Sequence, residues 1–178
     1  MPEALVIVDF QNDFAPGGAL AVPDGDAAAA HLNELAASPR FDLVVATRDW
    51  HPPDHASFAA QGGRWPVHCV AGTDGAQLHP TLDAAHVDVI VDKGTERDTE
   101  GYSGFDGTPL AALLRERGID RVTVAGLATD YCVRATALDA LHQGFEVTVD
   151  EAGSRGIDPG DSVVAMDEVR AAGGQVVG

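Results

Sequence analysis

The chain has 178 residues, of which 45% are hydrophobic, and its formal net charge is −17. This length suits a single domain with a core of its own. The negative charge argues against nucleic acid or an anionic membrane surface as partner, since both bind basic patches. No apolar run approaches the roughly 20 residues that a membrane span needs.

The two cysteines show no disulfide framework, and the N-terminus has no basic segment before its first apolar run. We therefore expect neither a disulfide scaffold nor a signal peptide, and we expect the protein to work in the cytoplasm. The sequence leaves open a homo-oligomer. Lys93 is the only lysine beside ten arginines. Its compact, tunable ammonium suggests a task that arginine cannot perform, although a lysine retained by chance would look the same.

Apolar, β-branched segments alternate with amphipathic segments along the chain. We predict strands at residues 4–8, 43–47, 87–91, 121–126, 145–149 and 175–177. We predict helices at residues 26–37, 109–117, from about 129 to 143, and 161–172. This alternation is typical of a single-domain, doubly wound α/β fold, with a mostly parallel sheet of about six strands and helices on both faces. The long, irregular connection over residues 50–85 is of a kind that usually carries function.

Chemically capable side chains follow the first four predicted strands: Asp9, Asp49, Lys93 and Cys132. The carboxyl ends of parallel strands meet at one edge of a sheet, where ligands of such folds bind. Each residue alone would pass for a solvated loop residue or a helix cap. Together they predict an active site at this edge.

A carboxylate and three imidazoles gather after the second strand: Asp49, His51, His55 and His68. Such ligands suit one divalent ion such as Zn, Fe or Mn. The alternative is that they are ordinary polar residues of a long loop. We favour the metal site, because three of the seven histidines fall within 18 residues beside an Asp.

Cys132 lies in the first turn of a predicted helix that follows a buried strand. Thr129 and Asp130 are residue types that cap helix N-termini. The positive end of the helix dipole favours thiolate over thiol, as a nucleophile requires. The alternative is a small residue that packs the helix onto the sheet.

Six motifs span nearly the whole chain: VDFQNDF (8–14), TRDWHPPDHASF (47–58), WPVHCVAGTDGAQLHP (65–80), DKG (92–94), GYSGF (101–105) and AGLATDYCVRATALDA (125–140). On these motifs the sequence resembles the isochorismatase-like cysteine hydrolases, and within them the nicotinamidases. The resemblance implies Cys132 as nucleophile, Asp9 as general base and then acid, and Lys93 as their charged partner. It also implies the metal ligands Asp49, His51, His55 and His68.

The resemblance further implies a cis peptide bond between Leu127 and Ala128, and an oxyanion hole made by the backbone N–H groups of Ala128 and Cys132. Four aromatic residues beside the motifs are candidate walls for a flat substrate ring: Phe14, Trp65, Tyr102 and Tyr131.

The implied activity is hydrolysis of nicotinamide to nicotinate and ammonia through a cysteine thioester, a step of NAD salvage, with pyrazinamide also accepted. The alternatives are another amide hydrolase of the same superfamily and a non-catalytic scaffold that binds a metabolite.

Overall fold

The computed structural model describes residues 1–178. Its six strands are β1 (Glu3–Val8), β2 (Leu43–Asp49), β3 (Val89–Lys93), β4 (Arg121–Leu127), β5 (Glu146–Arg155) and β6 (Gln175–Val177). They form one sheet in the order β3-β2-β1-β4-β5-β6, and every neighbouring pair is parallel. The predicted doubly wound α/β fold is confirmed.

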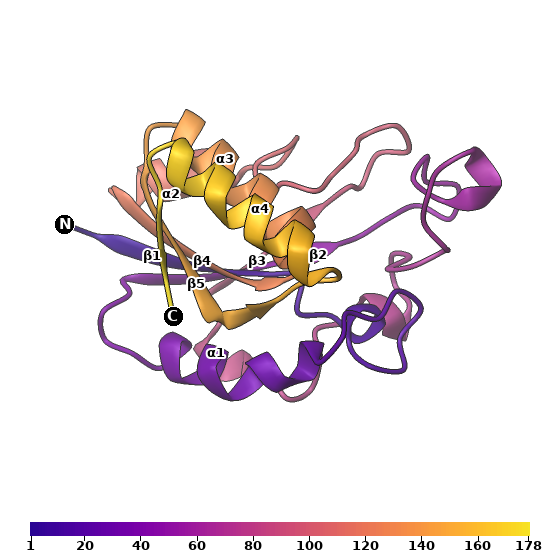
Figure 1. Ribbon diagram of the computed structural model, residues 1–178, viewed down its shortest axis with the longest axis horizontal. Helices are drawn as coiled ribbons and strands as arrows, with labels where there is room; N and C mark the ends of the chain where they lie inside the picture. Colours follow the sequence, from indigo (N-terminus) through magenta and orange to yellow (C-terminus); the bar gives the residue numbers. More distant parts are fainter.

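Helices cover both faces of the sheet. They are α1 (Ala29–Ala36), α2 (Leu110–Glu116), α3 (Arg134–His142) and α4 (Pro159–Ala171). Helix α1 lies on one face, while α2, α3 and α4 lie on the other (Figure 1). Two hydrophobic clusters, one on each side, contain the alternate residues of the central strands. A parallel sheet buried on both faces explains why its strands are almost uninterrupted apolar runs. None of the helices is long and apolar enough to cross a membrane.

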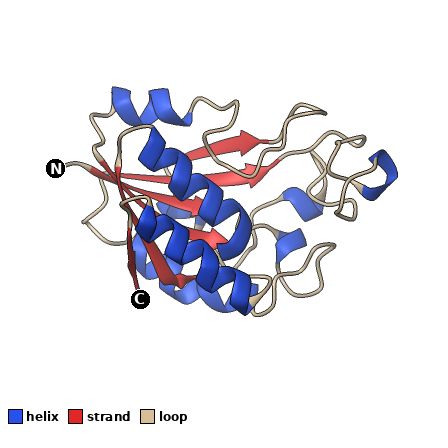
Figure 2. Ribbon diagram, turned by 45° about the horizontal axis from the view of Figure 1, so that its top comes forward, coloured by secondary structure: helices blue, strands red, loops and turns tan.

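The winding of the chain reverses at the middle of the sheet, where β1 lies beside β4. From β1 the chain moves outward to β2 and β3, and from β4 it moves the other way. The arrows of the central strands lead toward the same group of long loops (Figure 2). Ligands of doubly wound sheets bind outside the carboxyl ends of the strands at such a reversal. Asp9 and Cys132 follow the two strands that flank it.

Three strands end two or more residues beyond the apolar segments that predict them. Strand β2 continues to Asp49 and β3 to Lys93, and these two residues pair in register. Strand β5 continues to Arg155, past a register shift against β4. The difference arises because pairing with a neighbouring strand, and not apolar character, decides where a strand ends.

The connection from β4 to α3 departs from the predicted helix cap. Thr129–Val133 form a turn of π-helix, and no side chain caps its N-terminus. The Asp130 carboxylate instead accepts hydrogen bonds from the backbone N–H groups of Ile157 and Asp158, both at 3.0 Å. The predicted capping role of Thr129 and Asp130 is wrong, because the Asp130 carboxylate binds backbone N–H groups of a loop that is distant in sequence.

The long connection between β2 and β3 contains only three short 3₁₀ helices, at Ala59–Gln61, Asp74–Ala76 and Ala84–His86. The predicted helix at 26–37 likewise begins with a 3₁₀ turn, Gly25–Ala28, before α1.

Candidate active site

The ammonium of Lys93 lies at the centre of a group of side chains at the carboxyl edge of the sheet. Its side chain is fully buried. Its Nζ lies 2.8 Å from Asp9 Oδ2, 2.6 Å from Asp49 Oδ1 and 3.5 Å from Cys132 Sγ. It also donates a hydrogen bond to the Gly101 carbonyl at 2.7 Å. Its three hydrogens go to Asp49, Gly101 and Cys132, while Asp9 Oδ2 faces the ammonium as an ion pair without a hydrogen bond. A compact point charge suits such a close group better than the planar guanidinium of arginine.

Asp9 is held in one orientation by Thr47 of β2. The Thr47 hydroxyl donates a hydrogen bond of 2.8 Å to Asp9 Oδ1, and the Asp9 N–H donates to the Thr47 carbonyl at 3.1 Å. This leaves Oδ2 facing Lys93. Burial raises the pKa of Asp9 to about 6, although Lys93 opposes the shift. A buried carboxylate of this kind is a stronger base than one in water.

Cys132 is a buried thiol in the π-helical turn before α3. Burial raises the pKa of this thiol; Asp9 and Asp49 add to the rise, and Lys93 opposes it. The direction is opposite to the one expected for a thiol at a helix N-terminus, and the desolvation and the two nearby carboxylates account for it. Ligand atoms of Cys132, Asp9 and Asp49 lie within 4.8 Å of one another. The thiol therefore has a base within reach.

Asp49, His51 and His68 form a second group, next to the first. Each offers one ligand atom, and these atoms lie within 4.8 Å of one another. The Nε2 atoms of His51 and His68 lie 3.3 and 3.8 Å from Asp49 Oδ2. Their Nδ1 atoms donate to the carbonyls of Gly94 and Pro66, both at 2.7 Å. These bonds fix the tautomer that leaves Nε2 free for an ion, so the residues fit a divalent metal.

The ionisation states of the second group differ from residue to residue. Burial by itself would lower the pKa of His51, but the Asp49 carboxylate outweighs burial and raises it, so His51 must lose a proton when an ion binds. Burial by itself would raise the pKa of Asp49, but Lys93 and His51 outweigh it and hold that pKa far below its usual range. Burial lowers the pKa of His68, which favours the neutral imidazole that binds metals. The group formed by Asp9, Asp49 and Cys132 is different, since the Lys93 ammonium already lies among its atoms.

The structure does not bring His55 into the metal-ligand group. Its Nδ1 lies 2.7 Å from the Ser57 hydroxyl, and its Nε2 donates to the Thr99 carbonyl at 2.8 Å. The ring stacks on that of His51, with the centroids 3.9 Å apart. His55 is thus adjacent to the group, while both of its nitrogens are engaged by neighbouring loops.

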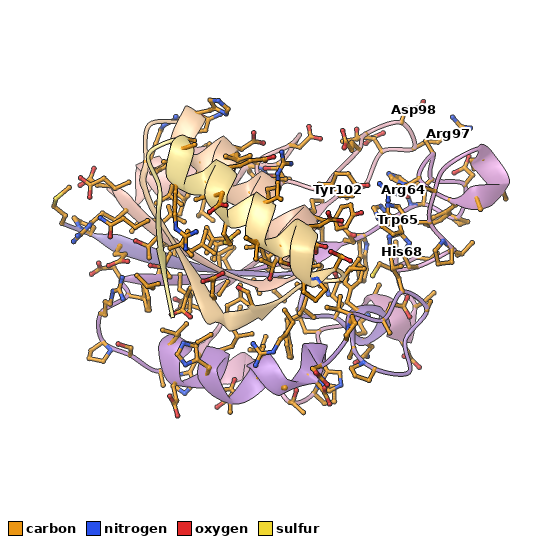
Figure 3. All side chains as sticks on the ribbon, in the orientation of Figure 1. Arg64, Trp65, His68, Arg97, Asp98 and Tyr102 are labelled. Atoms are coloured by element: carbon orange, nitrogen blue, oxygen red, sulfur yellow. The ribbon has the colours of Figure 1, made fainter.

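A small, mostly apolar cavity borders Cys132. The four aromatic residues predicted as pocket walls all line it: Phe14, Trp65, Tyr102 and Tyr131. Ala128, Asp49 and His68 line it as well. Trp65 Nε1 donates a hydrogen bond to the Tyr102 hydroxyl at 2.9 Å, and Figure 3 shows these two side chains close to His68. A larger cavity at the amino edge of the sheet contains none of the residues of either group.

The peptide bond between Leu127 and Ala128 is cis. It lies between the end of β4 and the turn that carries Cys132. Ala128 and Cys132 both line the cavity.

Sequence reasoning missed several residues of the site. Thr47 orients Asp9, and the Gly101 carbonyl binds Lys93. A Cβ atom on Gly94 would overlap the His51 ring, and one on Gly101 would lie 2.6 Å from the Gly94 Cα. Both glycines have positive φ, +60° and +74°. The available signal was their place in the DKG and GYSGF motifs.

A buried thiol, carboxylate and ammonium at the switch point of a doubly wound sheet define a hydrolytic enzyme of the α/β class. The model of the Isochorismatase domain matches residues 3–178, and the chain belongs to this family. The family expected from the motifs is thereby confirmed.

Three similar proteins make the relation more specific. The Escherichia coli nicotinamidase is 43% identical over 197 residues, covering 97% of this chain and 92% of that protein. The Pyrococcus horikoshii pyrazinamidase, solved in complex with zinc, is 49% identical, with a TM-score of 0.93 and 99% of both chains covered. The L. infantum protein PnC1, solved with nicotinate, is 39% identical, with a TM-score of 0.95 and coverage of 99% and 92%.

Proposed function

We propose that this chain hydrolyses nicotinamide to nicotinate and ammonia, and that it also accepts pyrazinamide. The observation that carries the proposal is the position of Lys93. Its Nζ contacts Asp9 and Cys132 on one side and Asp49 of the metal-ligand group on the other. A nucleophile and an ion site therefore face one aromatic cavity, as a flat carboxamide with a ring nitrogen requires. The E. coli relative is a nicotinamidase, which supports this substrate.

The first half of the reaction forms a thioester. Asp9 accepts the proton of the Cys132 thiol while the sulfur attacks the amide carbon, and the carbonyl π-electrons move onto oxygen. We assign the backbone N–H groups of Ala128 and Cys132 to that oxyanion; losing one such donor typically raises the barrier by about 3 kcal/mol. The C–N bond then breaks as Asp9 returns its proton to the nitrogen, and ammonia leaves.

The second half hydrolyses the thioester. Asp9, again a carboxylate, takes a proton from a water molecule while the oxygen of that water attacks the thioester carbon. The C–S bond breaks as Asp9 gives this proton to sulfur, and the product leaves as nicotinic acid, which loses its remaining proton to solvent to become nicotinate. Lys93 remains an ammonium throughout, because Asp49 and Asp9 outweigh the burial that would lower its pKa. It offsets negative charge at the site in every step.

We propose that Asp49, His51 and His68 hold one divalent ion, Zn, Fe or Mn. His55 would become the fourth ligand by giving up the hydrogen bond from its Nε2 to the Thr99 carbonyl. The P. horikoshii relative was solved with zinc, which supports this role. When bound, the ion supplies a Lewis-acidic position for the ring nitrogen of the substrate. Phe14, Trp65, Tyr102 and Tyr131 hold the flat ring through stacking and edge contacts.

Ammonia release from nicotinamide, measured with and without chelator and after adding back Zn, Mn and Fe separately, tests the proposal. Wild-type protein should release ammonia, lose activity with chelator and regain it with at least one ion. Cys132→Ala should bind nicotinamide but release no ammonia. An active Cys132→Ala variant would remove the sulfur from the mechanism.

The same assay separates the alternatives. A different amide hydrolase would turn over carbamoyl-type amides faster than nicotinamide, and a non-catalytic scaffold would bind without turnover. We also propose that the protein works in the cytoplasm, which its two free thiols support. A homo-oligomer remains a prediction, to be tested by light scattering.

A further inference from the structure

Two polar side chains that the reaction does not use follow β1 and reach the segments that carry the metal ligands. They belong to residues 11–13, which we call the β1 exit segment. We propose that Gln11 and Asp13 are positioning residues of the metal centre, which hold the main chain at Asp49 and beside His68. The proposal rests on the metal centre of the proposed function and adds residues that touch neither ion nor substrate.

Gln11 binds both backbone groups of Asp49. Its Oε1 accepts a hydrogen bond from the Asp49 N–H at 2.9 Å, and its Nε2 donates to the Asp49 carbonyl at 2.8 Å. The second amide hydrogen goes to the Ala76 carbonyl, also at 2.8 Å. The Gln11 side chain is completely buried. The Gln11 amide therefore pairs with the Asp49 backbone at the end of β2 as a neighbouring strand would. This pairing fixes the backbone from which the Asp49 carboxylate projects.

Asp13 holds the residue that follows His68. Its Oδ2 accepts a hydrogen bond from the Cys69 N–H at 2.8 Å. Cys69 has a φ of +47°, a left-handed conformation that is unfavourable for a non-glycine residue. A hydrogen bond to a carboxylate oxygen is stronger than one to a neutral acceptor. The Asp13 contact therefore helps to keep the chain in the conformation that positions His68.

The Cys69 peptide also reaches the third ligand. Its carbonyl accepts a hydrogen bond from the His51 N–H at 2.9 Å, and the His51 carbonyl accepts one from Ala71. The main chain beside His68 is therefore bonded to the main chain of His51. Through Gln11 and Asp13, the β1 exit segment anchors all three members of the metal-ligand group to the sheet.

Such anchoring matters here because the ligands after Asp49 lie in a connection that contains only 3₁₀ turns. A metal site needs its ligands held to within roughly 0.5 Å, and residues behind the ligands typically account for about 10–100-fold in affinity.

Asn12 lies between the two positioning residues and provides a control. Its side chain donates a hydrogen bond to the Asp74 carbonyl at 2.8 Å and makes no hydrogen bond to Asp49 or to the Cys69 peptide. Gly75 provides an independent perturbation, because a Cβ atom there would overlap the Asp13 carboxylate. Gly75→Ala therefore displaces Asp13 without removing it.

The experiment compares Gln11→Met, Asp13→Ala, Asp13→Asn and Gly75→Ala with Asn12→Ala and the wild type. Zinc affinity is measured by competition with a chromogenic chelator, and thermal unfolding is followed in excess chelator. We expect Gln11→Met, Asp13→Ala and Gly75→Ala to bind zinc about 10–100-fold more weakly. Ammonia release should recover as free zinc is raised. Asp13→Asn, which keeps one acceptor oxygen, should lose less, and Asn12→Ala should match the wild type.

Two results would overturn the inference. One is a wild-type zinc affinity in Asp13→Ala and Gly75→Ala together with a lower unfolding temperature in chelator, which would make the contacts purely structural. The other is an activity loss that excess zinc does not rescue. The proposed function fails differently: wild-type protein would bind zinc yet release no ammonia from nicotinamide.

Discussion

Replacing Lys93 with methionine tests the charge balance of the site most directly. Methionine keeps the apolar stem but removes the ammonium. The variant then buries Asp9 and Asp49 together, without the cation that lies 2.8 and 2.6 Å from their oxygens. Both carboxylates are buried, so water cannot replace that charge.

Removing one partner of a buried ion pair typically costs about 3–5 kcal/mol, because the other charge is left uncompensated. We expect a loss of this size in the free energy of unfolding of Lys93→Met at neutral pH. For a chain of this length each kcal/mol shifts Tm by about 2–4 °C. The variant should therefore melt about 6–20 °C lower than the wild type and should release no ammonia.

A double-mutant cycle with Asp9→Asn identifies the cause. The asparagine amide removes one of the two carboxylate charges and can still accept the hydrogen bond from Thr47. If uncompensated charge is the cause, Lys93→Met should cost much less in the Asp9→Asn background, with a coupling of about 1.5–3 kcal/mol.

Urea unfolding in excess chelator measures all four proteins without a contribution from metal. Single-variant losses that add to within about 0.5 kcal/mol would refute the reasoning, since independent sites behave in this way.

Two further predictions concern hydrogen bonds to buried carboxylates. Thr47→Val removes the hydroxyl that binds Asp9 Oδ1, so kcat/KM for nicotinamide should fall about 10–100-fold, the equivalent of about 1.5–3 kcal/mol. Thr47→Ser, which keeps the hydroxyl, should have nearly the wild-type kcat/KM. A fully active Thr47→Val would contradict the role of Thr47 in orienting Asp9. Burial by itself would raise the pKa of Glu3, but the hydrogen bonds from Arg40 and Thr123, together with the positive charges of Arg40 and Arg121, outweigh burial and lower it. A carboxyl group with a lowered pKa stabilises the fold while it is ionised, and this contribution is lost as the pH falls through that pKa. Arg40→Met should therefore lower the free energy of unfolding by about 1 kcal/mol at neutral pH, and urea titrations should show that the difference vanishes as acid protonates Glu3. An equal loss at neutral and acidic pH would exclude the ion pair as the cause.

The sequence alone was enough to predict the fold class and the edge of the sheet where the chemistry lies. Buried strands are visible as apolar runs, and parallel strands end at the same edge, so Asp9, Lys93 and Cys132 could be placed together before any strand order was known. The aromatic walls of the cavity, among them Trp65 and Tyr131, could be chosen because they lie beside the motifs.

The tertiary structure decided the charge and the contacts of each group. The helix that carries Cys132 predicts a thiolate, yet burial and two carboxylates from other strands raise the pKa of that thiol. His55 fits the spacing of a metal ligand, yet its nitrogens bind Ser57 and Thr99. Local patterns record which residues are buried, whereas a pKa or a hydrogen bond depends on neighbours that are distant in sequence. For that reason Thr47, 38 positions from Asp9, was found only in the folded chain.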